Sequence, residues 1–569
     1  MPEQIIKRNI SDFLNKEYLN YAFSVLEERA IPSLCDGFKP GARKIMHAAL
    51  AGTTKDGKLY KLLALSGDAM RVSLYAHGDI SLNSTIVGLC KYFNDNLNPI
   101  ESDSQVGSLR DPNSAGAPRY LYVRHSKYMD LIYKTDYDLL NFIYDEGQYV
   151  EPMNYLPIIP TLLCKNNIGV AVGYSMHNQA YNPLCLIDAC LGHINDSKDK
   201  VVIKPYIRGS KPTNWKYTDG HWFNYGEWKC NQSKDLLTVT DLPVDVSYED
   251  FEKLLNKFEE SGFIKSADNK STDGNVHYEI HFPPKGLANE IKKDKTTLQL
   301  ANKFKLIKQV SDDLLWVLDE NHKLKHFATV DDLVQYFVNW RLKIYVERKK
   351  RLVKILEERY KINSELVRFI ELVCSGKLVI RNRSKVDIKV DMESYKLPMQ
   401  LLSTQMSKVT IEERDELLRQ NEEIKKELEY IKNTTEKQMY IDDLNKLRST
   451  LEKEFPSPDK YNIDVDTVEV EVTGEARKTA AELEIEKIKK QKAKEKLVRD
   501  KEKATREKEK LAKQKAKEKA TREKEKLARQ KAKERAAREK ERLAKQKAKE
   551  RAAREKERLA KQKAKLLKK

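Results

Sequence analysis

Long apolar runs are missing from this chain of 569 residues. A membrane-spanning helix needs roughly 18 consecutive apolar residues, and no stretch approaches that length. The N-terminus, Met1–Arg8, also lacks the apolar core of a secretory signal. We therefore expect a cytoplasmic protein. The length predicts roughly two to four modules, because one hydrophobic core rarely extends so far.

Cysteine is scarce and shows no pairing motif. The seven cysteines are scattered along the chain, without a Cys-x-x-Cys pair. A structural zinc site needs paired ligands, and a secreted disulfide framework uses an even number of cysteines. The pattern predicts buried free thiols in a reducing compartment.

After Gly474 the chain contains no glycine or proline, and most of its net positive charge lies in that region. A 16-residue repeat rich in Lys, Glu and Ala starts at Ala504, occurs four times and carries almost all of the net charge of +19. Its leucines recur every 16 residues, so each is rotated by roughly 160° from the last and no apolar stripe forms. We expect a linker at 456–490 and a solvated single helix at 491–569, with disorder as the alternative.

Residues 1–150 mix short amphipathic helices with brief strands. Tyr21–Glu28 and Ala42–Leu50 have helical periodicity, and Gly and Pro punctuate the segment between them. This pattern is typical of a winged-helix module, in which one helix enters the major groove of DNA.

The rest of the body changes from strands to long helices. Between 151 and 328, the alternation at 276–282 predicts a half-buried strand, and Ser247–Ser261 predicts an amphipathic helix. Apolar residues at three- and four-residue steps predict one long helix at about 329–374 and a second helical stretch at about 409–453. Two antiparallel helices of this length suit a stalk that carries a dimer contact.

Five short motifs follow one another in a set order. They are Arg29-Ala-Ile-Pro-Ser-Leu-Cys-Asp-Gly-Phe-Lys-Pro-Gly-Ala-Arg43, Tyr75-Ala-His-Gly-Asp79, Asn113-Ser-Ala-Gly-Ala-Pro-Arg-Tyr120, Leu156-Pro-Ile-Ile-Pro160 and Gly169-Val-Ala-Val-Gly173. In this order and at these distances, the set resembles the DNA-cleavage subunit of a type IIA topoisomerase. It looks closest to the separate breakage subunit of T-even-like bacteriophages, over residues 8–455.

The resemblance implies an α+β multidomain fold. We expect a winged-helix cleavage domain at 1–150, a tower domain with a β-sheet at 151–328, and a long antiparallel coiled-coil stalk with a dimer gate at 329–455. The charged single helix at the C-terminus would follow the linker.

Tyr120 is the candidate nucleophile. A free phenol has a pKa near 10, so neighbouring cations must favour the phenolate and stabilise the charged transition state. Arg119 is placed for this by sequence, and Pro118 favours an extended Ala117. Tyr122 would share a face with Tyr120 in an extended segment, so spacing leaves both open. The family motif selects Tyr120, and implies a transient 5′-phosphotyrosine link whose resealing needs no ATP.

Other residues are matched to family roles by the resemblance alone. His77 matches a histidine that contacts the scissile region, and Val170 matches an apolar wedge that enters a base step and bends DNA. Four basic residues match positions around the cleaved strand: Arg29, Lys39, Arg43 and Lys44. Two family histidines are replaced, by Tyr75 and Ala42, and Ile80 stands at the family's drug-contacting serine. A solvated cationic face, a structural histidine and a buried valine are the alternatives.

The sequence lacks a carboxylate cluster for Mg²⁺ and a glycine-rich site for ATP. We expect no metal ligands in this chain, and expect Mg²⁺ and ATP to be bound by a partner subunit with ATPase and Toprim domains. The resemblance implies two copies of this chain in a heterotetramer or larger complex on double-stranded DNA. The repeat tail would bind DNA nonspecifically or act as a spacer.

Two other functions remain open at this point. The chain could be a nonenzymatic DNA-bridging protein that uses its basic tail and its stalk. It could also be a topoisomerase subunit that binds DNA with impaired cleavage, in view of Tyr75 and Ala42.

Overall fold

The computed structural model describes residues 9–461, except 55, 198–200, 219–220, 273, 311–313, 404 and 406–408, together with the short strand β17 (Val472–Thr473). The predicted repeat helix at 491–569 and most of the predicted linker lie outside the described residues. Within the described part, no helix combines the length and apolar character needed to cross a membrane.

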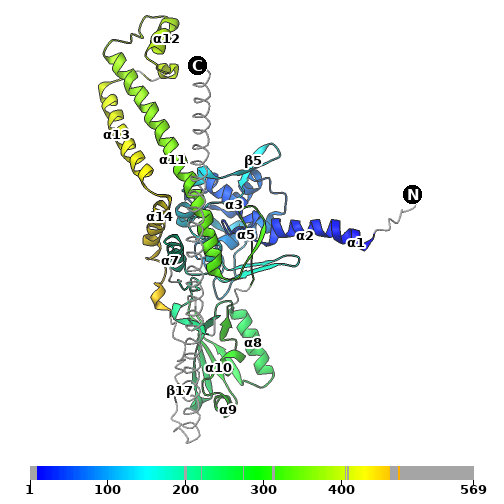
Figure 1. The fold of residues 1–569 in the computed structure, drawn as a ribbon. Coiled ribbons are helices and arrows are strands. Elements are labelled where there is room, and N and C mark those ends of the chain that lie inside the picture. Colours follow the sequence, from blue (N-terminus) through cyan, green and yellow to red (C-terminus); the bar gives the residue numbers. More distant parts are fainter. Residues whose placement is uncertain are drawn as a thin grey trace, which may run out of the picture. The chain divides into compact units, whose positions relative to one another are not determined.

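Three helices and a small sheet build the N-terminal part (Figure 1). Helices α3 (Pro40–Ala51), α4 (Leu62–Val72) and α5 (Asp79–Cys90) pack against one another. Strands β1 (Tyr60–Lys61), β3 (Tyr122–His125) and β2 (Ile100–Ser102) pair antiparallel in that order. These are the elements from which a winged-helix module is built, and α3 confirms the helix predicted at 42–50.

The chain enters this part through a helical segment. It comprises α1 (Ile10–Phe13), α2 (Leu19–Val25) and the turns that continue them to Ala30, which confirms the helix predicted at 21–28. Large apolar side chains along it are exposed, and its first buried residue is Leu26. The segment therefore carries an apolar surface that the described chain leaves uncovered.

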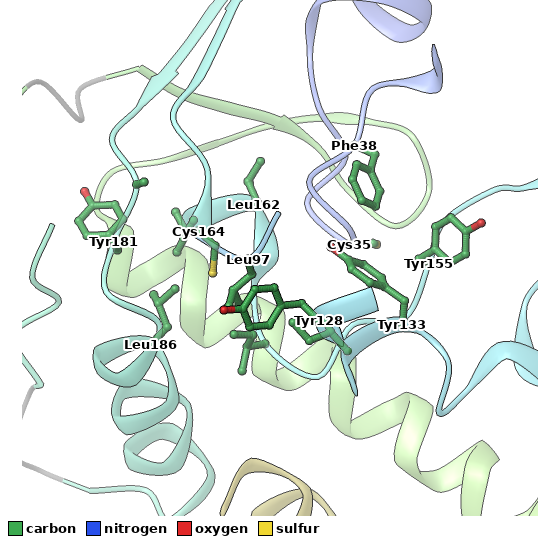
Figure 2. Packing of buried hydrophobic residues seen from close by; sticks show 14 of the residues in the cluster. Cys35, Phe38, Leu97, Tyr128, Tyr133, Tyr155, Leu162, Cys164, Tyr181 and Leu186 are labelled. Carbon is green, nitrogen blue, oxygen red and sulfur yellow. The ribbon is translucent and has the colours of Figure 1, made fainter. Parts of the chain in front are cut away.

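The largest hydrophobic cluster lies behind these helices and runs past residue 150 to Tyr461. Figure 2 shows Phe38, Tyr133 and Tyr155 gathered at one side of it. The ring centroids of Phe38 lie 5.5 Å from Tyr133 and 6.2 Å from Tyr155. Helices α6 (Lys127–Tyr133) and α7 (Pro183–Ile194) contribute to the same cluster.

Four antiparallel strands close one side of this cluster. Their order is β16 (Leu324–Phe327), β15 (Leu314–Leu318), β7 (Ser175–Asn178) and β6 (Asn167–Val170). One face of the sheet is buried through Met176, Leu315, Val317 and Phe327. Nearby, β4 (Phe142–Asp145) and β5 (Gln148–Pro152) form a separate hairpin.

Residues 228–306 contain a second hydrophobic cluster. Its sheet has the order β12 (Ser266–Asn269), β13 (Tyr278–His281), β11 (Leu236–Asp241), β10 (Glu227–Asn231) and β17. Helices α8 (Tyr248–Glu260), α9 (Gly286–Lys293) and α10 (Leu298–Lys303) complete it. A further sheet has the order β14 (Ile307–Gln309), β9 (His221–Tyr225) and β8 (Trp215–Thr218). Strand β13 and helix α8 confirm the strand predicted at 276–282 and the helix predicted at 247–261.

Helix α11 (Val330–Cys374) confirms the long helix predicted at 329–374. The second predicted stretch is two helices, α13 (Ile411–Asn433) and α14 (Glu436–Leu451), because Thr434 leaves the helical conformation and Thr435 caps the next helix. Figure 1 shows α13 beside α11, with α12 (Lys385–Ser394) at the far end. Lys432 pairs with Glu357 near one end, and Asn421 bonds Ser364 further along, so the two helices are antiparallel.

Buried charges join the base of α11 to its neighbours. The guanidinium of Arg341 is fully buried and pairs with Asp136, in the loop after α6. Arg348 pairs with Asp136 and with Asp443 of α14, and the Tyr345 hydroxyl donates to Asp443 at 2.7 Å. A buried guanidinium is tolerated only when paired, so these contacts fix α11 and α14 against the first cluster.

Candidate functional site

Tyr120 lies on the surface at the end of a 3-10 turn, Pro118–Tyr120. The next residue, Leu121, is buried, and its carbonyl accepts from the Leu62 amide at 2.9 Å at the start of α4. This anchor turns Tyr120 outward, and its side chain is 66% exposed. Ala117 is extended, as Pro118 predicts. A phenol held this way on a rigid turn is accessible to a large substrate.

The guanidinium of Arg119 lies over the Tyr120 ring, 4.7 Å from its centroid. A cation against the ring face is attracted by the ring quadrupole, so the pair keeps positive charge beside the phenol. Tyr122 differs from the prediction of one shared extended face. It begins strand β3 after the turn, is less exposed than Tyr120, and has its backbone bonded to Ser102 and Ser104.

His77 is exposed in the loop between α4 and α5. Its ring packs edge-on against Tyr75, with centroids 5.4 Å apart. The Tyr120 turn is bonded to the first residue of α4, whereas His77 follows the end of that helix, and 11 helical residues span roughly 16 Å. Within one chain, Tyr120 contacts Arg119, whereas the ring that His77 contacts is that of Tyr75.

Strand β6 is a meeting point of segments that are far apart in sequence. It carries Val170 and is contacted by the segments that carry Arg29 and Lys39. The ammonium of Lys39 donates to the Ile168 carbonyl at 3.1 Å. A Cβ at Gly169 would lie 2.2 Å from the Ala30 carbonyl oxygen, so only glycine lets the Arg29 segment approach this strand. Val170 ends the strand and is 75% exposed. A buried strand valine, the alternative interpretation of Val170, is thereby excluded.

Burial lowers the pKa of the Lys39 ammonium, because it lies partly covered between α3 and β6. An anion beside Lys39, in place of the lost solvent, would favour the charged form of its ammonium. Arg29 is exposed at the end of its helical segment. Lys39 thus contacts the strand that ends in the exposed Val170, and Arg29 directly precedes Ala30, whose carbonyl approaches the same strand.

The predicted phosphate contact of Arg43 requires correction, because this side chain is only 4% exposed. Its guanidinium donates to both carboxylate oxygens of Asp36 and to the Phe38 carbonyl. Burial opposes the charge, but the Asp36 carboxylate outweighs burial and raises the Arg43 pKa. Asp36 also accepts from the amides of Phe38 and Tyr155. Arg43 therefore holds the turn that carries Lys39.

Lys44 is also engaged within the chain. Its ammonium pairs with Glu151 at 2.7 Å and donates to the Ser73 carbonyl at 2.8 Å. The side chain is half-buried, so it ties α3 to β5 and to the end of α4. A direct phosphate contact by Lys44 would have to break these bonds.

Several residues that position the site were not singled out by sequence. Ser102 and Ser104 hold the backbone of Tyr122, and Gln105 accepts from the Gly116 amide at 2.9 Å. Leu121 anchors the turn. Serine–backbone bonds leave no periodic pattern, which is why apolar periodicity did not reveal these contacts.

Among the described residues, one group has metal-ligand chemistry: Asp268, Glu279 and His281, on β12 and β13. Their ligand atoms lie within 4.8 Å of one another. However, the ammonium of Lys270 already pairs with Glu279 at 2.6 Å, and the group belongs to the second cluster's sheet.

Six of the seven cysteines are buried, as predicted, all are free, and Cys374 is exposed.

Comparisons with known proteins agree with these observations. The family of DNA gyrase/topoisomerase IV A-type subunits matches residues 29–446. A mitochondrial DNA topoisomerase 2 of Dictyostelium discoideum is 30% identical over 78% of this chain and 35% of its own length. A DNA topoisomerase 2 of Invertebrate iridescent virus 6 is 26% identical over 78% of this chain and 39% of its own.

A solved structure of the Plasmodium falciparum topoisomerase II DNA-binding, cleavage and re-ligation domain is also similar. Its TM-score is 0.70 at 26% identity, covering 78% of this chain and 64% of that chain. The chain spans about a third of the length of the curated relatives it matches. Because the family matches residues 29–446, which are most of this chain, the chain belongs to the family of DNA gyrase/topoisomerase IV A-type subunits.

Proposed function

We propose that this chain is the DNA breakage-reunion component of an ATP-dependent type II topoisomerase, which relaxes and unlinks DNA by passing one duplex through another. The observation that carries this proposal is the exposed Tyr120 phenol with the Arg119 guanidinium over its ring, on a turn anchored to a three-helix module. The similar proteins, named as DNA topoisomerase 2 and as a topoisomerase II cleavage and re-ligation domain, support the same activity.

In the proposed reaction, the Tyr120 phenolate oxygen attacks a backbone phosphorus. The bond from phosphorus to the 3′ oxygen breaks and that oxygen takes up a proton from water, which leaves a 5′-phosphotyrosine and a 3′-hydroxyl. The reverse attack, with loss of that proton, reseals the strand. Arg119 provides positive charge where the phosphate becomes more negative in the transition state. The link conserves the energy of the broken ester, so resealing consumes no ATP.

Duplex DNA would bind as to a winged helix, with α5 in the major groove. The first residues of α5 are exposed, among them Ile80 at 77%, while Leu82 and Ile86 face the core. Val170 would enter a base step between the phosphate-contacting cations Arg29 and Lys39. Valine is a short wedge, so a weak kink is expected.

Two copies of the chain would cut opposite strands. The antiparallel pair α11 and α13 fits the proposed coiled-coil stalk, and α12 at its end exposes Val386 and Val390, one helical turn apart. Such a face suits a dimer gate. A second copy would also bring its own His77, which would act beside the Tyr120 of the first copy.

Mg²⁺ and ATP would be bound by a partner polypeptide with Toprim and ATPase domains. The described residues near Tyr120 do not form a carboxylate cluster, and the acidic group on β12–β13 is occupied by Lys270. The helical segment 10–25 gives that partner an apolar surface, since Ile10, Phe13 and Phe23 are exposed on it. A phage-like division into separate subunits would place this contact between two chains.

Trapping the covalent complex tests this function. The chain is mixed with its partner, Mg²⁺ and supercoiled plasmid, and denaturant is added. We expect protein attached to 5′ DNA ends, lost in Tyr120→Phe and retained in the matched control Tyr122→Phe. Loss only in Tyr122→Phe would reassign the nucleophile. Binding without any covalent product would favour a cleavage-impaired or purely DNA-bridging protein.

A further inference from the structure

The loop that leads to Tyr120 is held firmly at its Tyr120 end. It comprises residues 103–117, between strand β2 and the 3-10 turn that carries the phenol. The Ser104 hydroxyl accepts from the first amide of β3 at 3.0 Å. A Cβ at Gly116 would lie only 3.2 Å from the Leu121 side chain. This end of the loop is therefore packed against the residues that directly follow the nucleophile.

The two sides of the loop are also bonded to each other. Val106 and Ala115 form an antiparallel bridge. At the tip, the Ser108 amide donates to the Asp111 carbonyl at 3.0 Å, and Gly107 has a φ of 97°, which glycine adopts without strain. Because the loop is braced in this way, a displacement of its tip should be passed along it to the nucleophile.

The tip is joined to the second cluster by one residue, Arg110. Its guanidinium pairs with Asp241, the last residue of β11, at 2.8 Å. The guanidinium also donates to three backbone carbonyls, those of Leu242, Pro243 and Val246. The Arg110 carbonyl accepts from the Tyr248 amide, at the start of α8, at 2.9 Å. Arg110 thus bonds the whole turn between β11 and α8.

This contact is largely shielded from solvent. The side chains of Arg110 and Asp241 are 11% and 14% exposed. Burying both charges costs solvation energy that offsets their attraction, so such a pair contributes more to a fixed geometry than to net stability. Lys211 also reaches Asp241, but only at 3.9 Å, and its side chain is 53% exposed. Of these two cations, only Arg110 belongs to the loop that leads to Tyr120.

We propose that Arg110 is a positioning residue for DNA cleavage. It fixes the tip of the loop to the second cluster, and so sets where the Tyr120 oxygen stands relative to the scissile phosphate. The inference deepens the proposed function and rests on it. An error of about 1 Å in the position of a reacting group can cost about 100-fold in rate, so a loosened loop should slow the chemical step. The second cluster thereby contributes to the chemistry without entering the site.

Single-turnover cleavage separates positioning from folding. The full chain is mixed with its partner, Mg²⁺ and duplex DNA at several concentrations, and covalent complex is trapped over time. We expect Arg110→Ala to lower the rate constant by about tenfold or more, with the final amount of complex and the half-saturating duplex concentration within about twofold of wild type. A folding defect would instead remove active molecules, and so lower the final amount at an unchanged rate constant.

Two further variants sharpen this test. Lys211→Ala is the matched control and should keep the wild-type rate constant, because it removes a cation near Asp241 without changing the loop. The nearly isosteric Asp241→Asn should slow cleavage. The double variant Arg110→Ala, Asp241→Asn should be no slower than Arg110→Ala alone, because both changes break one contact.

The outcomes distinguish this inference from the proposed function. An unchanged rate constant in Arg110→Ala and Asp241→Asn, or a loss of final amount alone, would overturn the positioning role and leave the proposed function standing. A wild-type chain that forms no covalent complex would refute the proposed function, and the role of Arg110 with it.

Discussion

Three arginines of this chain show how one residue type takes different roles according to its surroundings. Arg119 is exposed and lies over a phenol ring. Arg29 is exposed beside an apolar hairpin, whereas Arg43 is buried in a pair with Asp36. Because a guanidinium can clamp either a phosphate or a carboxylate in two-point contact, residue type alone does not say which it meets.

Replacing Arg43 should destabilise the fold. Arg43→Ala leaves the Asp36 carboxylate buried without its cation, which typically costs about 3–5 kcal/mol. Urea unfolding measures this cost. Arg29→Ala is the matched control: we expect its stability to stay within about 0.5 kcal/mol of wild type. Its DNA affinity should fall, with a salt slope smaller by about one. Equal stabilities for the two variants would contradict the structural role of Arg43.

At the scale of elements, the site depends on how closely two backbones approach. The segment that ends at Ala30 touches strand β6 at Gly169, and the turn of residues 32–34 pairs with the end of β15 through Leu318. These contacts carry Arg29 and Lys39 to the wedge hairpin. A side chain at the point of closest approach would separate the elements, so glycine is required there.

Gly169→Ala should therefore weaken both stability and DNA bending. The new Cβ would lie 2.2 Å from the Ala30 oxygen, so one backbone must move. We expect a loss of about 1–3 kcal/mol, since overpacking at a close contact costs this much. Gly88→Ala in α5 is the control, because a Cβ there meets open space. Its effect should be neutral or slightly stabilising. Thermal unfolding of both variants checks the stability, and the fluorescence of an end-labelled duplex measures the DNA bending. A neutral Gly169→Ala would contradict the close approach.

On the scale of the whole molecule, the cores do not follow the order of the predicted modules. The first cluster takes residues from Leu26 to Tyr461 and crosses the boundary predicted at residue 150. Residues 228–306 have a core of their own, and further clusters lie along α11 and α13. Tyr461 is buried and contacts Asn182, so the body extends into the linker predicted at 456–490.

Removing the repeat tail should leave the body intact if the truncation follows Gly474. We expect the variant lacking residues 475–569 to unfold at the same temperature as the full chain. Its affinity for duplex DNA should fall, with a flatter dependence on salt, because phosphate contacts by basic residues release counterions. Fluorescence anisotropy at two or more salt concentrations measures this. Unchanged binding would leave the tail only a spacer role.

Local sequence patterns predicted which segments form helices and strands better than they predicted which segments pack together. Helix α11, strand β13 and helix α8 follow from apolar periodicity, which acts over a few residues. The break at Thr434 was not predicted, because the apolar positions continue through it and the N-cap at Thr435 is a single residue. The motif around Tyr120 predicted the exposed phenol and its cation, since Arg119 is its neighbour in sequence.

What the sequence determined by itself is therefore the set of elements, the Arg119–Tyr120 pair and the family, because each depends on neighbours along the chain or on an ordered set of motifs. The tertiary structure alone decided that Arg43 faces Asp36, that Lys39 and the segment ending at Ala30 meet strand β6, and that Trp316 packs against Tyr174 and His326. Those contacts join residues far apart in the chain. Their energies depend on burial and on which groups the packed core brings within bonding distance, and a linear pattern contains neither.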